Sequence, residues 1–197
     1  MPTPQERLFA LLFERAFRYS ETAQFKLTSG QASRFYIDCK TVSMDAEGAF
    51  LIGNLLWERI GGLDVGGVGG MTLGADPLAI AVAVMSFIKH KPIPAFVVRK
   101  APKGHGSGRQ VEGALCPGAR VVVLEDVVTT GGSTLQTLEV LKKEGHTALK
   151  VIALIDRQEG GAARIAETGI PFESLFTLDD FIKKMGTPQT GDRDDRL

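Results

Sequence analysis

The sequence predicts an α/β protein with a mostly parallel central sheet covered by helices on both faces. Stretches with a strand pattern alternate with stretches of helical periodicity, and the strand candidates are almost continuously apolar, as in sheets buried on both faces. The length of 197 residues allows one substantial core, so we expect a single domain over residues 1–185. The polar, Gly- and Pro-containing stretch 186–197 is expected to be a disordered tail.

Helices are expected where apolar residues recur every three or four positions. Residues 3–6, Thr-Pro-Gln-Glu, form a capping-box pattern, and Phe9, Phe13 and Phe17 would lie on the apolar stripe of the helix that follows. Further helices are expected at 46–60, 77–88 and 133–144, with Gly145 ending the last one.

Strands are expected at four apolar runs and in one N-terminal segment. The runs are 65–69, 93–99, 120–125 and 149–155. Residues 25–38 contain two short strand-like pieces around a turn at Ser29-Gly30.

The composition excludes several classes of function. Lysine plus arginine and aspartate plus glutamate number 23 each, so no overall field favours nucleic acid or a membrane. The longest apolar stretch, 77–88, is too short to cross a bilayer, and early charges such as Glu6 and Arg7 argue against a signal peptide. Cys39 and Cys116 lack metal or redox spacing, so we expect reduced packing residues in a cytoplasmic protein.

Residues 121–134 are the most informative stretch of the chain. An apolar run leads to Glu125 and Asp126, followed by a turn of threonines and glycines and then by a helical pattern. A strand that opens through such a loop into a helix presents backbone N–H groups to a phosphate. The acids suit a ligand that also carries hydroxyl groups or a metal ion, so the stretch indicates a phosphorylated sugar.

Three other loops should meet this one, because ligands bind beyond the carboxyl ends of parallel strands. The glycine-rich loop 69–77 suits a diphosphate, although a glycine-rich turn with a capping Asp76 would explain it too. Loop 99–110 alternates basic residues with glycine, which is typical of a lid over an anionic substrate. Arg157 suits a substrate carboxylate, or alternatively a salt bridge.

Stretch 121–134 resembles the phosphoribosyl diphosphate (PRPP) binding motif of the type I phosphoribosyltransferases. Within that family, residues 25–38, the basic loop from Arg99 to His105, and Asp-Arg-Gln-Glu at 156–159 are similar to motifs of orotate phosphoribosyltransferases. The resemblance covers about residues 20–160 in four correctly ordered blocks. Purine phosphoribosyltransferases share the first motif but lack the pattern of residues 25–38 and of the basic loop.

The resemblance implies the type I phosphoribosyltransferase fold, with a small N-terminal hood at about 20–40 and a flexible catalytic loop at about 99–113. It also implies an Mg²⁺-dependent enzyme that transfers the phosphoribosyl group of PRPP to orotate, giving orotidine 5′-monophosphate and diphosphate in pyrimidine (UMP) biosynthesis. A homodimer is implied as well, in which the loop acts across the subunit interface. The Mg²⁺ ion would be held mainly by PRPP and water, without direct side-chain ligands.

The resemblance further assigns residue roles. Lys103 and Asp126 are the expected catalytic residues, and orotate would be bound by Thr129, Arg157 and the backbone around Phe35 and Tyr36. The residues expected to bind PRPP are Arg99, Lys100, Lys103, His105, Glu125, Asp126, Val127, Val128, Thr129, Thr130, Gly131, Gly132 and Ser133.

The chain departs from the family pattern at two places. Many members carry Tyr-Lys where this chain has Leu73-Gly74, and a lysine where it has Thr28, with Lys26 two residues earlier. The alternatives are a PRPP-sensing regulatory protein and a phosphoribosyltransferase for another base. The neutral net charge disfavours the first, and residues 25–38 with Arg157 disfavour the second.

Overall fold

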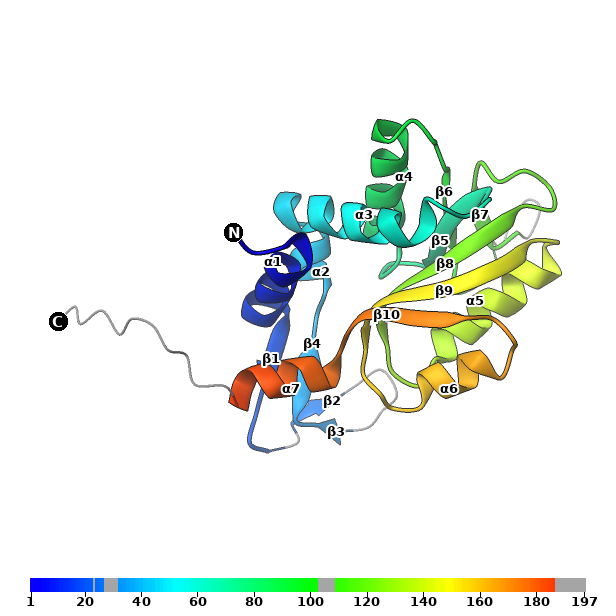
Figure 1. Cartoon of the computed structure of the whole chain (residues 1–197). Coiled ribbons are helices and arrows are strands. Elements are labelled where there is room, and N and C mark those ends of the chain that lie inside the picture. Colours follow the sequence, from blue (N-terminus) through cyan, green and yellow to red (C-terminus); the bar gives the residue numbers. More distant parts are fainter. Residues whose placement is uncertain (23, 27–31, 103–108, 187–197) are drawn as a thin grey trace.

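A six-stranded sheet forms the centre of the protein (Figure 1). The computed structural model describes residues 1–22, 24–26, 32–102 and 109–186. In the described residues the strand order is β10-β9-β8-β5-β6-β7, and every pair is parallel except β6 with β7. The strands are β5 (Gly67–Met71), β6 (Ala95–Val98), β7 (Val111–Gly113), β8 (Arg120–Val128), β9 (Thr147–Asp156) and β10 (Phe172–Thr177). The predicted mostly parallel α/β fold is confirmed.

Helices cover both faces of the sheet (Figure 1). On one face lie α3 (Ala46–Ile60) and α4 (Asp76–Ile88), and on the other lie α5 (Gly132–Lys143) and α6 (Gly161–Ala166). Alternate residues of β8 enter the two cores: Val122 packs on the α3/α4 side and Val123 on the α5/α6 side. Burial on both faces is the reason why the strands are almost continuously apolar.

The N-terminal part forms a separate layer beside the carboxyl ends of the strands (Figure 1). Strands β1 and β4 pair with each other, as do β2 and β3, and we call β1–β4 the hood. The elements of this layer are α1 (Pro4–Leu11), a π-helical turn η1 (Leu12–Ala16), β1 (Phe17–Tyr19), β2 (Phe25–Lys26), β3 (Ala32–Ser33), β4 (Phe35–Ile37), α2 (Lys40–Ser43) and the C-terminal helix α7 (Leu178–Gly186).

Aromatic contacts join this layer to the edge of the sheet. The Phe9 ring lies 5.3 Å from that of Phe176 on β10 and 4.9 Å from that of Phe181 on α7. Phe181 also stacks on Phe17 at 5.2 Å. These contacts hold the hood against the strand ends, where the sequence places the polar loops.

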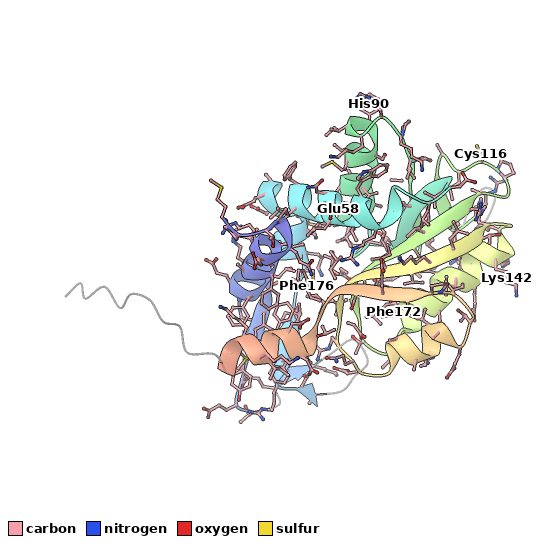
Figure 2. The ribbon with its side chains drawn as sticks, viewed as in Figure 1. Glu58, His90, Cys116, Lys142, Phe172 and Phe176 are labelled. Carbon is pink, nitrogen blue, oxygen red and sulfur yellow. The ribbon has the colours of Figure 1, made fainter. Side chains whose placement is uncertain are left out.

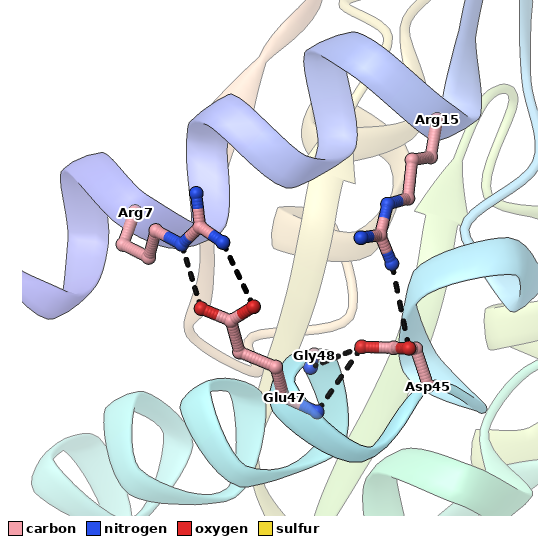
Figure 3. A network of polar contacts seen from close by, with 5 residues as sticks. All are labelled: Arg7, Arg15, Asp45, Glu47 and Gly48. Atoms are coloured by element: carbon pink, nitrogen blue, oxygen red, sulfur yellow. Dashed lines mark hydrogen bonds and ion pairs between the residues drawn. The ribbon is translucent and has the colours of Figure 1, made fainter.

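Two ion pairs connect the first helices to α3 (Figure 3). Arg7 binds both carboxylate oxygens of Glu47, at 2.6 and 2.8 Å, and Arg15 lies 3.4 Å from Asp45. Asp45 also accepts the backbone N–H groups of Glu47 and Gly48 as the N-cap of α3. Because these charges are exposed, we regard them as fixing the orientation of the helices more than the stability of the fold.

The predicted helix boundaries agree closely with the structure. The capping box at Thr3 is present, helix 46–60 is confirmed, and Gly145 ends α5 with a φ of +84°. The predicted N-terminal helix is too long by one residue, because Phe17 begins β1. Its last turn is also π-helical, which the 3.6-residue periodicity does not reveal.

The strands differ more from expectation. β8 continues to Val128 instead of ending at residue 125, because it remains paired with β9 as far as Asp156. β7, β10, α6 and α7 are not in the prediction, and β7 falls inside the stretch expected to be a flexible lid. Short elements of this kind are stabilised by a neighbour, here β6 for β7, and have little local pattern of their own.

Other expectations have mixed outcomes. Cys39 is buried as predicted, but Cys116 is exposed in the connection before β8, so its expected packing role is wrong (Figure 2). The Ser29-Gly30 turn and tail residues 187–197 lie outside the described residues, whereas Gly186 ends α7. The domain boundary at 185 stays a prediction. Across the described ranges, no helix has the length and apolar character needed to cross a membrane.

Candidate active site

A cavity of about 670 Å³ lies where the carboxyl ends of β5, β8 and β9 meet the hood. Eight of its lining residues, Glu125–Val127 and Thr129–Ser133, belong to the predicted PRPP motif. Its lining residues are Lys26, Tyr36, Ile37, Lys40, Met71, Thr72, Leu73, Gly74, Lys100, Glu125, Asp126, Val127, Thr129, Thr130, Gly131, Gly132, Ser133 and Arg157.

The two adjacent acids of β8 point to opposite sides, as neighbours in a strand do. Glu125 turns toward the start of α5, where Ser133 Oγ and Thr134 Oγ1 donate to its Oε2 at 2.8 and 3.1 Å. Asp126 turns toward α2, where its Oδ2 lies 3.8 Å from Lys40 Nζ. The acids therefore face different parts of the cavity from within the strand and not from its end.

Burial makes both carboxyl groups harder to ionise. Desolvation, together with the neighbouring charge of Asp126, raises the pKa of Glu125 to about 7. Desolvation also raises the pKa of Asp126 above its ordinary value, and the charge of Lys40 opposes this shift. The pair can thus change its charge near neutral pH, as is common at functional sites.

The loop between β8 and α5 points the N-terminus of a 12-residue helix at the cavity. Gly131 has a φ of +76° and caps α5 without a side-chain acceptor for the first helical N–H groups. The carbonyl groups of Thr129 and Thr130 are occupied by Gly161 N–H at 3.0 Å and Arg164 Nη1 at 2.6 Å. N–H groups and the positive end of the helix dipole therefore remain for an anion such as a phosphate.

The loop after β5 forms a second wall. α4 begins at Asp76, one residue before the predicted start at Pro77, and Asp76 Oδ2 accepts a hydrogen bond of 2.7 Å from Thr72. A Cβ atom on Gly74 would lie 2.5 Å from Asp126 Oδ1, so the loop passes directly beside this acid. Leu73 and Gly74, the positions that depart from the family pattern, line the cavity, and so does Lys26.

Arg157 connects the end of β9 to the hood. Its guanidinium is buried and donates to Glu159 Oε1 at 2.8 Å, Ser33 Oγ at 3.1 Å and the Phe35 carbonyl at 3.3 Å. Each of the three guanidinium nitrogens has a partner, so a substrate carboxylate would have to use a remaining N–H or replace one of these contacts.

The structure brings together most, but not all, of the predicted site residues. Tyr36, Lys100, Glu125–Val127, Thr129–Ser133 and Arg157 line the cavity. Two other predicted residues lie elsewhere: Arg99 pairs with Glu112 at 3.6 Å, and Val128 is buried in the sheet. The Phe35 ring packs on Phe17 and Tyr19, whereas its backbone carbonyl, in the segment expected to bind orotate, accepts from Arg157. Lys103 and His105 lie outside the described residues.

Lys40 is a cavity residue that the sequence analysis missed. It follows the hood strand β4 in the order Asp38-Cys39-Lys40, and its Nζ lies 2.8 Å from Asp38 Oδ1. A charged pair immediately after the buried end of a strand was the available signal, because charges beside a core need a partner or a function.

Comparison with known proteins identifies the family. Residues 69–173 match the family described as Phosphoribosyl transferase domain. The chain is 46% identical over 178 residues to the orotate phosphoribosyltransferase of Aquifex aeolicus, covering 90% of this chain and 97% of the relative. It is 49% identical over 181 residues to that of Sorangium cellulosum, covering 90% and 93%.

The chain belongs to the orotate phosphoribosyltransferase family. Solved structures of orotate phosphoribosyltransferases are similar in fold as well. The Mycobacterium tuberculosis protein in complex with PRPP has a TM-score of 0.73 and 32% identity, covering 91% of this chain and 99% of the other. The Aeropyrum pernix protein has a TM-score of 0.76 and 34% identity, covering 91% and 97%. An adenine phosphoribosyltransferase from Leishmania tarentolae, at 19% identity, shares the fold alone.

The likeness to orotate phosphoribosyltransferases extends beyond the matched domain. Residues 69–173 include the acids, the α5 N-terminus and Arg157 but leave out the hood. The curated orotate phosphoribosyltransferases align over about nine tenths of the chain. The hood therefore belongs to the part of the sequence on which the specific family assignment rests.

Proposed function

We propose that this chain transfers the phosphoribosyl group of PRPP to orotate, giving orotidine 5′-monophosphate and diphosphate in pyrimidine biosynthesis. The observation that carries the proposal is the convergence in one cavity of an acid pair, a free helix N-terminus and a buried arginine that contacts the hood. Family membership supports the same reaction, since the relatives carry the name orotate phosphoribosyltransferase.

The binding role of each group of cavity residues follows from its chemistry. The 5′-phosphate would accept hydrogen bonds from the N–H and hydroxyl groups of Thr129–Ser133. Asp126 and Glu125 would accept the ribose hydroxyl groups. Arg157 would bind the orotate carboxylate, and Tyr36 and Thr129 would lie against the base.

The reaction forms a bond between a ring nitrogen of orotate and the anomeric carbon while the carbon–oxygen bond to diphosphate breaks. The proton of that nitrogen is released to diphosphate or to solvent. Diphosphate leaves with the electron pair, and positive charge develops on the ribose, as in glycoside chemistry. An ionised Asp126 beside the sugar would stabilise that charge. Lys100, with Arg99, Lys103 and His105 of the same loop, would neutralise the leaving group and exclude water.

The side chains of the cavity are compatible with an Mg²⁺ ion that binds as a complex with PRPP. In the described residues no three His, Cys, Asp or Glu side chains form a cluster that could hold a metal ion. Mg²⁺ in such enzymes keeps several waters and binds substrate phosphates, so we propose PRPP oxygens and water as its main ligands. The ion would supply charge neutralisation on the diphosphate.

We also propose a homodimer in which the loop starting at Arg99 serves the neighbouring subunit. Helix α4 exposes four large apolar side chains at helical spacing, Ile80, Val84, Phe87 and Ile88. An exposed apolar stripe of this kind is typical of a protein interface. Arg99 pairs with Glu112 and does not line its own cavity, which fits a role in the partner's site.

A cytoplasmic location is part of the same proposal. Both cysteines are free thiols, as is usual in a reducing compartment. Substrates would be the small molecules PRPP and orotate, and no binding to nucleic acid or membrane is proposed.

An absorbance assay with PRPP and Mg²⁺ tests the function, with orotate, uracil, adenine, hypoxanthine and guanine supplied in turn. We expect consumption of orotate alone, lost in Asp126→Asn and kept in Asp64→Asn, because Asp64 is exposed on the surface. Turnover of another base would favour a different transferase. PRPP binding without turnover of any base would favour a PRPP-sensing regulator.

A further inference from the structure

The position of Lys40 in the cavity is unusual because it lies among carboxylates. Its Nζ is 2.8 Å from Asp38 Oδ1 and 3.8 Å from Asp126 Oδ2, and its side chain remains 40% exposed toward the cavity. Glu125, the neighbour of Asp126 in β8, adds a third acid to this region. Within the described ranges, Lys40 is the cation that forms an ion pair with Asp126.

The backbone around Lys40 is anchored firmly. Cys39 is fully buried, and its Sγ lies 3.8 Å from the backbone carbonyl of Asp126. Val42, two residues after Lys40 in α2, is also fully buried. Because both neighbours are held in the core, the ammonium group is presented to the cavity from a rigid support, which lowers the entropic cost of ordering it.

The loop after β5 cannot supply such a charge. Its cavity residues Met71–Gly74 include no cation. A Cβ atom at position 74 would lie 2.5 to 2.9 Å from the carboxylate atoms of Asp126, so a lysine there would displace the acid. Lys40 approaches the same carboxylate from a different element, α2.

We propose that Lys40 binds the anionic diphosphate part of PRPP beside Asp126 and replaces the cation that the loop at Leu73-Gly74 lacks. The inference rests on the proposed function and adds a substrate-binding residue to it. Without Lys40, Glu125 and Asp126 would line this part of the cavity with no cation of the described residues paired to Asp126, and their charge would repel an anionic substrate. The rigid cation partly cancels these charges before the substrate arrives, so its binding costs little reorganisation.

The charge of Lys40 also affects the ionisation of the site. The charged and titratable groups that interact with Asp126 are Lys40, Asp38 and the Cys39 thiol on its own side of the strand, and Glu125 on the opposite side. Burial lowers the pKa of Lys40, but the hydrogen bond to Asp38 and the charge of Asp126 outweigh this effect, so its pKa is raised. Lys40 therefore stays charged, and its loss would raise the pKa of Asp126 further.

Steady-state kinetics of Lys40→Met and Lys40→Arg test the inference. We expect the KM for PRPP to rise by about tenfold or more in Lys40→Met, as for loss of one charged hydrogen bond, with a smaller change for orotate. The acidic limb of kcat/KM should move to higher pH. Lys40→Arg should recover most of both effects, because it restores the charge.

Lys142→Met is the matched control, since Lys142 is exposed on α5 at the end of the molecule away from the hood (Figure 2). A purely structural role would lower the melting temperature of Lys40→Met and leave its KM and pH profile unchanged. That outcome, with wild-type turnover intact, would overturn the inference.

Calorimetric titration with PRPP and Mg²⁺ separates this inference from the proposed function. If the wild-type protein turned over no base, the proposed function would fail. Weaker PRPP binding in Lys40→Met than in Lys142→Met would still support the Lys40 assignment, and equal binding would refute it.

Discussion

Glu125 illustrates at the scale of one residue how a functional site costs stability. Its carboxyl group is 5% exposed, and its pKa is raised to about 7 from an ordinary 4.5. The folded state therefore holds a proton that the unfolded state has released between these two values. Hence this group makes the free energy of unfolding fall as the pH rises from 4.5 to 7.

Glu125→Gln should remove the loss of stability that ionisation of the buried carboxyl group causes. The amide oxygen can still accept hydrogen bonds from Ser133 and Thr134 without carrying charge. We expect the variant to be more stable than wild type by about 1 to 3 kcal/mol at pH 8 and to differ little near the acid end. Urea unfolding at pH 5 and pH 8 measures the difference in the free energy of unfolding between the variant and wild type. Glu58→Gln, at an exposed position, is the control (Figure 2). An equal change in the free energy of unfolding at both pH values would contradict the raised pKa of Glu125.

Arg157 combines a structural and a binding role in one guanidinium group. It contacts Ser33, the Phe35 carbonyl and Glu159 through separate nitrogens. Arg157→Lys keeps the charge but loses the planar set of donors. We expect kcat/KM for orotate to fall by roughly 10- to 100-fold, with a smaller effect on the KM for PRPP.

Initial rates at saturating PRPP measure the effect of Arg157→Lys. Arg59→Lys is the control, since Arg59 forms a 3.9 Å ion pair with Glu173 outside the cavity. A variant that loses PRPP and orotate affinity in equal measure would point to collapse of the hood and not to a carboxylate-binding role.

At the scale of elements, the turn between β8 and α5 shapes the phosphate-binding end of the cavity. Gly131 and Gly145 have φ values of +76° and +84°, where a residue with a Cβ atom is strained. A Cβ atom at 131 would also lie 3.2 Å from the Gly161 carbonyl, whereas one at 145 would meet no atom within 4 Å.

Gly131→Ala and Gly145→Ala therefore form a matched pair of substitutions. Both should lower the free energy of unfolding by about 1 to 2 kcal/mol through backbone strain. Gly131→Ala should also raise the KM for PRPP, because it moves the loop that presents the helix N-terminus, whereas Gly145→Ala should leave the KM unchanged. Equal kinetics in the two variants would show that the turn does not shape the phosphate site.

The elements themselves were predictable to different degrees. Helices 46–60 and 133–144 carry strong periodicity and appear within one residue of expectation. β7 and β10 are edge strands of the sheet, and their pairing with β6 and β9 decides their conformation. Local sequence records the preference of a segment but not the neighbour that supplies its hydrogen bonds.

At the scale of the whole molecule, the exposed stripe on α4 predicts self-association. Val84 lies in its middle and is 56% exposed. Val84→Glu should convert a dimer into monomers, because a charge buried without a partner in an apolar interface is costly. Size-exclusion chromatography with light scattering measures the mass, and Ile182→Glu on α7, distant from α4 (Figure 1), is the control. A monomeric wild type would refute the dimer.

Mixing two inactive variants extends this test to the shared loop. Arg99→Ala removes a loop charge that does not line the cavity of its own subunit, and Asp126→Asn removes a cavity acid. If the loop serves the partner's cavity, a mixed dimer contains one intact site, and activity returns after subunit exchange. If each loop serves its own cavity, every site in the mixed dimer keeps one defect and no activity returns.

The sequence by itself determined the fold class, the order of the main elements and the acid–loop–helix motif. These features depend on periodicity and on residues adjacent in the chain, such as Glu125 and Asp126 before the Thr129–Ser133 turn. It also indicated Arg157, because the carboxyl ends of parallel strands converge at one edge of the sheet.

Only the tertiary structure decided which side chains share the cavity. Lys40 enters it from α2, 86 positions before Asp126 in the chain, whereas Arg99, Val128 and the Phe35 ring turn elsewhere. The close approach of Gly74 to Asp126 is likewise a relation between separate loops. Distances between segments far apart in sequence arise from packing of the layers, which no local pattern encodes.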